Sequence, residues 1–300
     1  MDNISLIEPK KKWFDVDIKG LWRYRDLYFM YIKRDIVTGY KQTVLGPLWL
    51  FISPVFTTIV YMFVFGGLAG ISTDGIPQPL FYMAGVTLWN YFSACFSSCS
   101  GVFAANAGVF GKVYFPRLVV PLSSCTSNLI KLGIQFMMFT AIYIYYVATG
   151  QFSFPLDVFS FSSTFSLPFW LSSSLSILLT ILLSIVFILM VGLHAMSWGL
   201  IITSWTTKYR DLNFLIGFGV QLLMYATPII YPVSFAPEAY RPYLALNPLT
   251  PIFEAFKYIL LGSGTFEISS LLLSAGILLL TMTLSIIIFN RTEQRFMDTV

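Results

Sequence analysis

Long apolar stretches constrain this chain of 300 residues more than any other feature of its sequence. A transmembrane helix needs about 20 consecutive, predominantly apolar residues. Six stretches meet that length, and they cover roughly 46–68, 80–104, 121–147, 175–203, 213–231 and 269–289. The sequence therefore predicts an all-α integral membrane protein with six transmembrane helices.

The composition excludes a soluble enzyme. Only 11% of the residues are charged, 57% are hydrophobic, and the mean hydropathy is +0.76. A soluble domain spends about a quarter of its residues on charged side chains. The net charge of +4 is too small to indicate a nucleic-acid partner, and three cysteines form neither a disulfide framework nor a paired zinc motif. Residues 1–20 lack the apolar core of a cleavable signal peptide.

Basic residues gather on one side of the predicted spans. Of the 18 lysines and arginines, 15 lie before the first span, between the second and third, between the fourth and fifth, or after the last. Cytoplasmic loops carry the excess of these residues. We therefore expect both termini in the cytoplasm. The chain would comprise a tail with an interface helix (1–45), a six-span domain (46–290) and a second tail (291–300).

Residues 20–38 predict an amphipathic helix that lies in the membrane interface. Apolar and aromatic side chains share one face: Leu21, Tyr24, Tyr28, Ile32 and Ile36. Charged side chains gather opposite: Arg23, Asp26, Lys33 and Arg34. One interpretation is a simple anchor. The other is that Arg34 and Lys41 contact the phosphate of a lipid substrate, because cationic side chains bind phosphate strongly.

A helix too short to span a bilayer is predicted between the fifth and sixth spans. Asn247 would cap it, Pro248 would take its first position, and Gly262 would end it. Three further residues of this helix are candidates for a gate at the outer mouth, one apolar and two charged: Phe253, Glu254 and Lys257. We expect a half-inserted helix pair that gates the outer mouth. The alternative is an ordinary surface hairpin.

One charged residue falls deep inside a predicted span. Lys131 belongs to a polar stripe whose members are three or four residues apart: Ser124, Asn128, Lys131 and Gln135. A lysine at mid-bilayer costs roughly 2.5–3.5 kcal/mol, so it should face protein or water. The stripe indicates either the wet wall of a substrate path or a lysine paired at a helix contact.

Aromatic residues make up 18% of the chain. Those placed deep in the predicted spans include Tyr61, Trp89, Tyr91 and Tyr225. Because aromatic faces pack well against sugar rings, these four are candidates for a substrate path. Packing in the core or against lipid is the alternative for each of them.

The sequence lacks the motifs of a motor or a metal enzyme. No G-x-x-x-x-G-K-[S/T] occurs, and the nearest string, 108–113, has the wrong spacing. The single histidine, His194, has no carboxylate or cysteine at ligand spacing, which favours packing. No carboxylate pair lies within the spans. We therefore expect no cofactor or metal on this chain, and any work against a gradient must draw its energy from another chain.

Several short motifs, in order along the chain, carry a family resemblance. They are YKQTVLGPLW (40–49), KYRDL (208–212) followed by ATPIIYP (226–232), and NPL (247–249) followed by LLG (260–262). Together they resemble the membrane subunit of type-2 ABC exporters of polysaccharides and polyol phosphates, most closely the O-antigen exporters of Gram-negative bacteria. The resemblance covers residues from about 20 to 290.

The resemblance implies six spans, an N-terminal interface helix and short periplasmic gate helices that map to 248–261. It implies two copies of this chain around one pore in the bacterial inner membrane, with two copies of a cytoplasmic ATPase that binds ATP and Mg. The substrate would be an undecaprenyl-diphosphate-linked glycan, moved from cytoplasm to periplasm. The ATPase would dock on a coupling segment that includes Lys112, Tyr114, Phe115 and Pro116. Where the family commonly has arginine in the gate, this chain has Lys257.

Other functions remain as alternatives at this stage. A teichoic acid, capsule, lipid or drug exporter of the same type-2 architecture fits the same composition. A membrane enzyme that acts on lipid-linked sugars needs titratable residues clustered at one membrane face. The sequence has only scattered ones, including Asp74, Asp157, Glu238 and Glu267. A transport subunit is therefore the leading interpretation.

Overall fold

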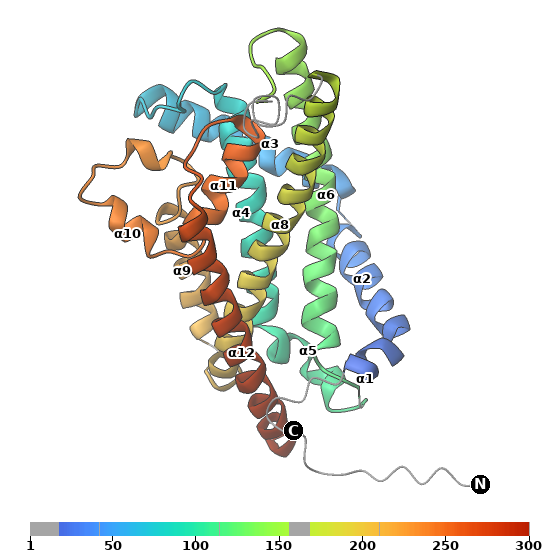
Figure 1. Cartoon of the computed structure of the whole chain (residues 1–300). Coiled ribbons are helices and arrows are strands. Elements are labelled where there is room, and N and C mark those ends of the chain that lie inside the picture. Colours follow the sequence, from blue (N-terminus) through green and yellow to red (C-terminus); the bar gives the residue numbers. More distant parts are fainter. Residues whose placement is uncertain (1–17, 42, 114, 156–168, 210, 300) are drawn as a thin grey trace.

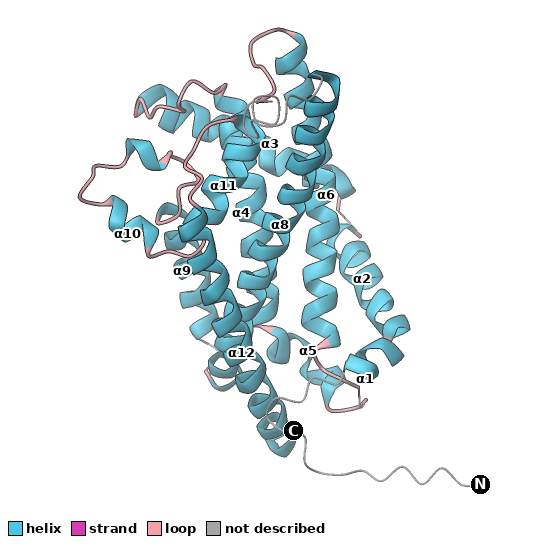
Figure 2. Cartoon of the chain, viewed as in Figure 1, coloured by secondary structure: helices cyan, strands magenta, loops and turns pink. Residues whose placement is uncertain are grey.

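The computed structural model describes residues 18–41, 43–113, 115–155, 169–209 and 211–299. Within these ranges the chain consists of helices joined by turns and loops, without a strand (Figure 2). The α-helices are α1 (Ile18–Arg23), α2 (Arg25–Tyr40), α3 (Trp49–Tyr61), α4 (Gln78–Ser100), α5 (Val102–Phe110), α6 (Val119–Ala148), α8 (Phe169–Lys208), α9 (Leu212–Tyr225), α10 (Arg241–Ala245), α11 (Thr250–Leu261) and α12 (Ile268–Thr299). Short segments of other helix types are η1 (Gly46–Leu48), η2 (Met62–Leu68, a π-helix) and η4 (Val233–Phe235).

Helix α4 is the centre of the bundle. It packs against α6 and α8, and α8 packs in turn against α12. Helix α2 lies along the outside of α6, and α11 is inserted between α8, α4 and α12. Figure 1 places α1, α5 and the C-terminal end of α12 at one end of the bundle, and α11 in the opposite half. We refer to the first of these as the α5 end.

The predicted spans are confirmed in part. By length and composition, four helical segments among the described residues could cross a membrane: Gly46–Leu68, Val119–Ala148, Ser172–Lys208 and Ile268–Gln294. The other two predicted spans have different bounds in the structure. The stretch 80–104 divides at Gly101 into α4 and α5, and 213–231 forms a helix only as far as Tyr225.

Helix α4 is long enough to span a bilayer but is less apolar than the four segments above. It has 23 residues, and 16 of them are buried by its neighbours, including Trp89, Tyr91 and Cys99. A helix enclosed by protein does not need a lipid-like surface, because its side chains meet other side chains. This enclosure explains why a central helix carries serine, asparagine and tyrosine. Whether α4 and α9 both cross the membrane stays a prediction.

The predicted interface helix forms, but its apolar face contacts protein. Tyr31 and Ile32 are buried against α6, and the Tyr28 hydroxyl lies 2.6 Å from Thr126 Oγ1. We expected this face to meet lipid, and that expectation is wrong for its central turns. A second set of apolar side chains on α1 and α2 is exposed instead: Trp22, Phe29, Met30 and Val37. These residues are the ones available to a membrane.

Two glycines let α8 approach α4 closely. A Cβ at Gly199 would lie 2.6 Å from Cys99 Cβ and 2.8 Å from the carbonyl oxygen of Phe96. One helical heptad earlier, a Cβ at Gly192 would overlap the Tyr91 ring. Small residues at such positions allow the backbones of membrane helices to come together. The α4–α8 contact therefore depends on the absence of side chains at two points of α8.

We predict that Gly199→Ala lowers the thermal unfolding midpoint of the detergent-purified protein. The added methyl group meets a backbone carbonyl that cannot rotate away, and overpacking of this kind costs about 1–3 kcal/mol. Gly276→Ala on α12 is the matched control, because a Cβ there has nothing within 4 Å and alanine favours a helix. Equal midpoints for the two variants would contradict the close-packing interpretation.

Candidate substrate groove and gate helix

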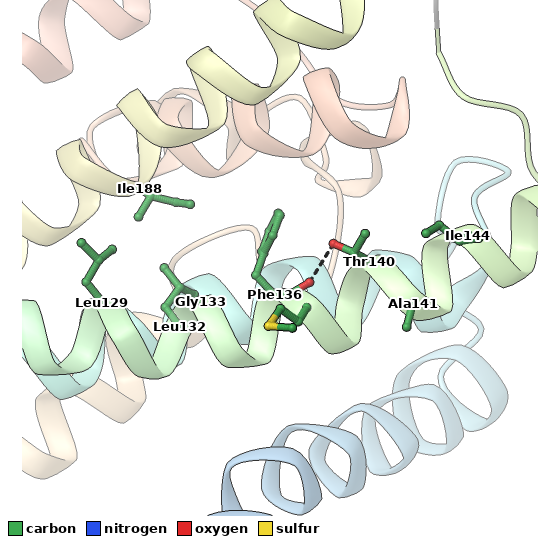
Figure 3. A pocket seen from close by; sticks show the side chains of 9 residues that line it. Leu129, Leu132, Gly133, Phe136, Thr140, Ala141, Ile144 and Ile188 are labelled. Atoms are coloured by element: carbon green, nitrogen blue, oxygen red, sulfur yellow. Dashed lines mark hydrogen bonds between the residues drawn. The ribbon is translucent and has the colours of Figure 1, made fainter. Parts of the chain in front are cut away.

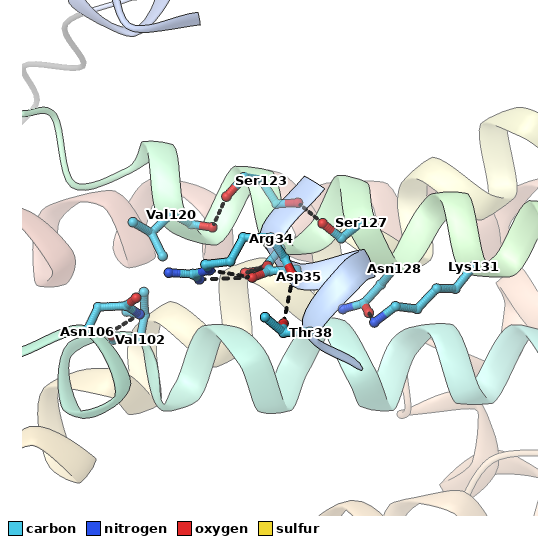
Figure 4. A network of polar contacts seen from close by, with 11 residues as sticks. Arg34, Asp35, Thr38, Val102, Asn106, Val120, Ser123, Ser127, Asn128 and Lys131 are labelled. Carbon is cyan, nitrogen blue, oxygen red and sulfur yellow. Dashed lines mark hydrogen bonds and ion pairs between the residues drawn. The ribbon is translucent and has the colours of Figure 1, made fainter. Parts of the chain in front are cut away.

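The polar stripe of α6 lines a groove with α2, α3 and α4. A cavity of about 530 Å³ lies beside Arg34, Asp35, Ser124, Asn128 and Lys131. A second cavity of about 210 Å³ shares Asn128 and Lys131 with the first. It is completed by Ser53 of α3, Asn90 and Tyr91 of α4, and Gln135 of α6. We call these two neighbouring cavities, which share Asn128 and Lys131, the polar groove; Figure 4 shows the side chains around the first.

The end of the groove nearer α2 is organised by one ion pair. Arg34 donates from Nε and Nη2 to Asp35 Oδ1 at 3.1 and 2.9 Å. The Ser124 hydroxyl donates to Asp35 Oδ2 at 3.0 Å, which ties α2 to α6. The Arg34 guanidinium also lies 4.3 Å from the Tyr31 ring centroid. The carboxylate of Asp35, which the sequence analysis did not single out, therefore holds the predicted phosphate contact Arg34 in place.

Lys131 lies where the two cavities meet. Its Nζ donates to Asn128 Oδ1 at 3.2 Å (Figure 4). Gln135 lies one turn further along α6 and lines the smaller cavity. The structure thus brings together the three predicted residues of the stripe, Asn128, Lys131 and Gln135. Lys41 is exposed at the end of α2 and does not line the groove.

The four predicted path aromatics do not gather in one place. Trp89 and Tyr91 belong to the core, at 4% and 5% exposed, and the Trp89 ring stacks on Phe92 at 5.0 Å. The Tyr61 hydroxyl donates to Met224 Sδ at 3.5 Å, whereas Tyr225 is half exposed. Only Tyr91 of the four lines the polar groove. Trp89 is too enclosed to stack on a sugar ring, so its predicted contact with substrate does not fit this conformation.

An apolar cavity runs along α6 beside Leu129 to Ile144. It encloses about 580 Å³, and its lining includes Leu129, Phe136, Ile144 and, from α8, Ile188 (Figure 3). Its one hydroxyl, on Thr140, donates to the Phe136 carbonyl oxygen at 2.8 Å and so is already satisfied. A surface of this kind suits acyl chains or apolar side chains and offers nothing to a sugar.

The predicted coupling segment forms α5 and the turn after it. Lys112 is exposed and Pro116 is half-buried, whereas Tyr114 lies outside the described residues. Phe115 is only 3% exposed, because its ring packs on Phe110 and Tyr31. In this conformation the Phe115 ring is not exposed to a partner, and its predicted contact with the ATPase stays a prediction. Its ring anchors the turn and leaves Lys112 available.

Helix α11 is held by a buried ion pair. Lys257 Nζ lies 2.9 Å from Glu254 Oε1, and both side chains are 2% exposed. Lys257 Nζ also donates to the carbonyl oxygen of Pro228 at 2.7 Å and lies 4.4 Å from the Phe81 ring centroid. Glu254 Oε2 accepts a hydrogen bond from the backbone N–H of Thr265 at 3.3 Å. One charge pair thus joins α11 to α4 and to loops on both sides.

Further polar contacts fix the two ends of α11. Asn247 Oδ1 accepts from the backbone N–H of Leu249 at 3.0 Å, and its Nδ2 donates to Thr227 Oγ1 at 2.9 Å. The predicted cap is wrong: α11 begins at Thr250 with Leu249 as its N-cap residue, because Pro251 rather than Pro248 occupies its first turn, and Asn247 lies in the turn before it. At the other end the Tyr143 hydroxyl donates to the carbonyl oxygen of Leu260 at 3.0 Å. The Ser274 hydroxyl donates to the Pro248 carbonyl oxygen at 2.6 Å.

These contacts disfavour the alternative of an ordinary surface hairpin, whereas the gate role of α11 stays a prediction. Ten of its 12 residues are buried, among them Phe253, and Gly262 ends it in the left-handed conformation at φ 73°. Sequence reasoning missed Tyr143 and Ser274 because their partners are backbone carbonyls far along the chain. His194, with its Nε2 3.3 Å from Ser274 Oγ, is packed as predicted.

We predict that Lys257→Met destabilises the protein strongly, because it leaves the Glu254 carboxylate buried without its cation. Breaking a buried pair in this way costs about 3–5 kcal/mol. The double variant Glu254→Gln with Lys257→Met should recover part of that loss, and Glu267→Gln, at an exposed position, is the control. The single variant Glu254→Gln completes the cycle, and thermal unfolding of the unaltered protein and these four variants measures the coupling. Additive effects of the two substitutions would contradict it.

Comparison with known proteins agrees with this architecture. The profile of the ABC-2 type transporter family matches residues 26–261. An O-antigen export system permease protein RfbA of Klebsiella pneumoniae is 26% identical over 277 residues, covering 91% of this chain and 94% of that protein. The RfbA of Myxococcus xanthus is 22% identical over 94% of this chain and 98% of its own. The polysialic acid transport protein KpsM of Escherichia coli is 22% identical over 87% and 91%. Because the family profile covers most of the chain, from α2 to the end of α11, this protein belongs to the ABC-2 type transporter family of membrane proteins.

Proposed function

We propose that this chain is the permease subunit of an ATP-driven exporter of O-antigen polysaccharide. The observation that carries the proposal is the similarity of almost the whole chain to permeases named for O-antigen export in two organisms. The cargo would be an undecaprenyl-diphosphate-linked glycan, moved from the cytoplasm to the periplasm. The polar groove supports this choice, because its hydroxyl, amide and cationic side chains suit a substrate rich in hydroxyl and phosphate groups.

The energy would come from a separate ATPase. The sequence has no phosphate-binding loop of its own, and permease subunits of this family work with an ATP-hydrolysing partner. The α5 end would face the cytoplasm, with both termini on that side. Lys112 and Val113, both exposed after α5, would contact the ATPase, and the buried Phe115 would keep their turn rigid.

Two copies of the chain would enclose the path. Exposed aromatic side chains occur on α3, η2 and α9, on surfaces that no other described part of the chain covers: Phe56, Phe63, Phe214 and Phe218. In a membrane these surfaces can meet lipid or a second copy. A pore between two copies would place these aromatic side chains along its seam, together with Tyr225.

Capsule export is the second candidate, because KpsM is a polysialic acid transport protein and aligns over most of this chain. A membrane enzyme is disfavoured. Among the described residues no group of three or more histidine, cysteine, aspartate or glutamate side chains is arranged so that it could hold a metal ion. A catalytic site for lipid-linked sugars would need such a cluster, or a comparable set of titratable groups at one face.

We predict that deletion of the gene causes lipid-linked glycan to accumulate inside the cell, with loss of the surface polymer. Mass spectrometry of extracted lipids and cell-surface staining measure the two quantities. Restoration by the plasmid-borne gene is the control. Continued surface display of the polymer in the deletion strain would contradict the proposal. The glycan that accumulates would distinguish O-antigen from capsule.

We predict that Lys112→Glu combined with Val113→Asp reduces copurification of the ATPase by about tenfold. The change removes an exposed cation and an exposed apolar contact and adds two negative charges at the proposed docking surface. Leu246→Asp, at an exposed position after α10 and away from the α5 end, is the control and should keep the ATPase bound. Normal copurification of the ATPase with the double variant would contradict the proposal that the turn after α5 contacts the ATPase.

A further inference from the structure

Lys131 differs from the ion-paired basic side chains of this protein. Lys257, Arg34 and Arg117 each lie within 4.0 Å of a carboxylate. Lys131 takes part in no ion pair among the residues that the structure describes, and its hydrogen-bond partner is the neutral amide oxygen of Asn128. It lies near the middle of α6, a helix that is long and apolar enough to span the bilayer. An unpaired ammonium at that depth is costly, so a counter-charge from outside the chain would stabilise it.

The side chains around Lys131 are also short of partners. Ser53, Asn90 and Gln135 line the 210 Å³ cavity, each from a different helix of the groove wall. Their side chains form no hydrogen bond within the described chain. Together with the ammonium of Lys131 they supply hydroxyl, amide and cationic donors that converge on one space. Such a set of donors fits the oxygens of a phosphate group.

The net charge of the polar groove favours an anion. Arg34 and Lys131 contribute two positive charges and Asp35 one negative charge. Two hydrogen bonds from Arg34 and one from Ser124 already occupy the Asp35 carboxylate, so it is not the partner that Lys131 lacks. The 530 Å³ cavity gives access to Lys131 from the side of α2, and the smaller cavity lies beyond it.

We propose that the polar groove binds the phosphate of a lipid head group, with Lys131 as the charged contact and Ser53, Asn90 and Gln135 as hydrogen-bond donors. The head group would enter between α2 and α6, beside the Arg34–Asp35 pair, and its acyl or prenyl chain would remain in the surrounding bilayer. The lipid is either the polyprenyl carrier of the cargo or a bulk anionic phospholipid. The site belongs to one copy of the chain and does not depend on which polymer is exported.

The test measures lipid binding to the full-length chain purified in maltoside detergent. Two matched pairs of lipids differ only in the phosphate-bearing head: undecaprenyl phosphate against undecaprenol, and phosphatidylglycerol against diacylglycerol. We expect at least one phosphorylated lipid to bind about tenfold or more tightly than its uncharged counterpart, the size typical of a charge-assisted contact. Preference in the first pair alone identifies the carrier lipid, and preference in both identifies anionic lipids generally.

The variants decide whether the groove is responsible. Lys131→Met should abolish the preference and Lys131→Arg should keep it. Asp35→Asn should strengthen the preference, because it removes the negative charge of the groove. Lys33→Met, at an exposed position on α2 outside the groove, is the control and should change nothing. If Lys131→Met does not yield folded protein, Gln135→Leu replaces it and should weaken the preference severalfold.

Two results would overturn the proposal: no preference for phosphorylated lipid in the unaltered protein, or a preference that Lys131→Met and Gln135→Leu leave intact. Export of polymer is measured in cells and is independent of this assay. A negative binding result therefore contradicts the phosphate site without contradicting the proposed export function.

Discussion

The close contact of α4 with α8 is the constraint on which the rest of the bundle depends. Gly192 and Gly199 bring the two helices together, and α4 is then enclosed by α6 on its other side. Because α4 is enclosed, it can carry polar side chains such as Asn90 into the interior of the bundle. That placement supplies one wall of the polar groove. The packing of α8 and one wall of the groove therefore depend on the same helix, α4.

The two lysines inside the bundle, Lys257 and Lys131, have different partners. Lys257 is paired with Glu254, bonded to a backbone carbonyl and covered by the Phe81 ring, which leaves it no capacity for a ligand. Lys131 borders open space and shares one hydrogen bond with a neutral amide. In a low-dielectric interior, the fully paired Lys257 stabilises the fold. Lys131 lacks a counter-charge and has hydrogen-bonding capacity left for a ligand. Burial and partners both separate these two lysines, because Lys257 is 1% exposed and ion-paired whereas Lys131 is half-buried and bonded only to a neutral amide.

The sequence predicted the features that depend on composition and local spacing. The helical character, four of the spans and the stripe through Lys131 involve residues close together in the chain. The start of α11 was predicted two residues early. The other errors concern contacts between distant residues. The apolar face of α2 packs on α6, and Trp89 is enclosed by the core. Apolar residues follow the same spacing along the sequence whether their side chains contact lipid or protein. No local signal could therefore have distinguished contact with lipid from contact with protein.

The contacts of α11 also limit how an outer gate can move. Lys257 and Asn247 bind α11 to residues 226–228, so α11 and the turn after α9 must shift together or break buried polar contacts. Breaking them would leave Glu254 or a carbonyl oxygen unpaired in the interior, which is costlier than moving an exposed loop. The segment from η4 through α10 lies mostly at the surface, with Tyr240, Tyr243 and Leu246 exposed. An opening motion that conserves buried contacts would therefore displace this segment first and carry α11 only as one body with the end of α9.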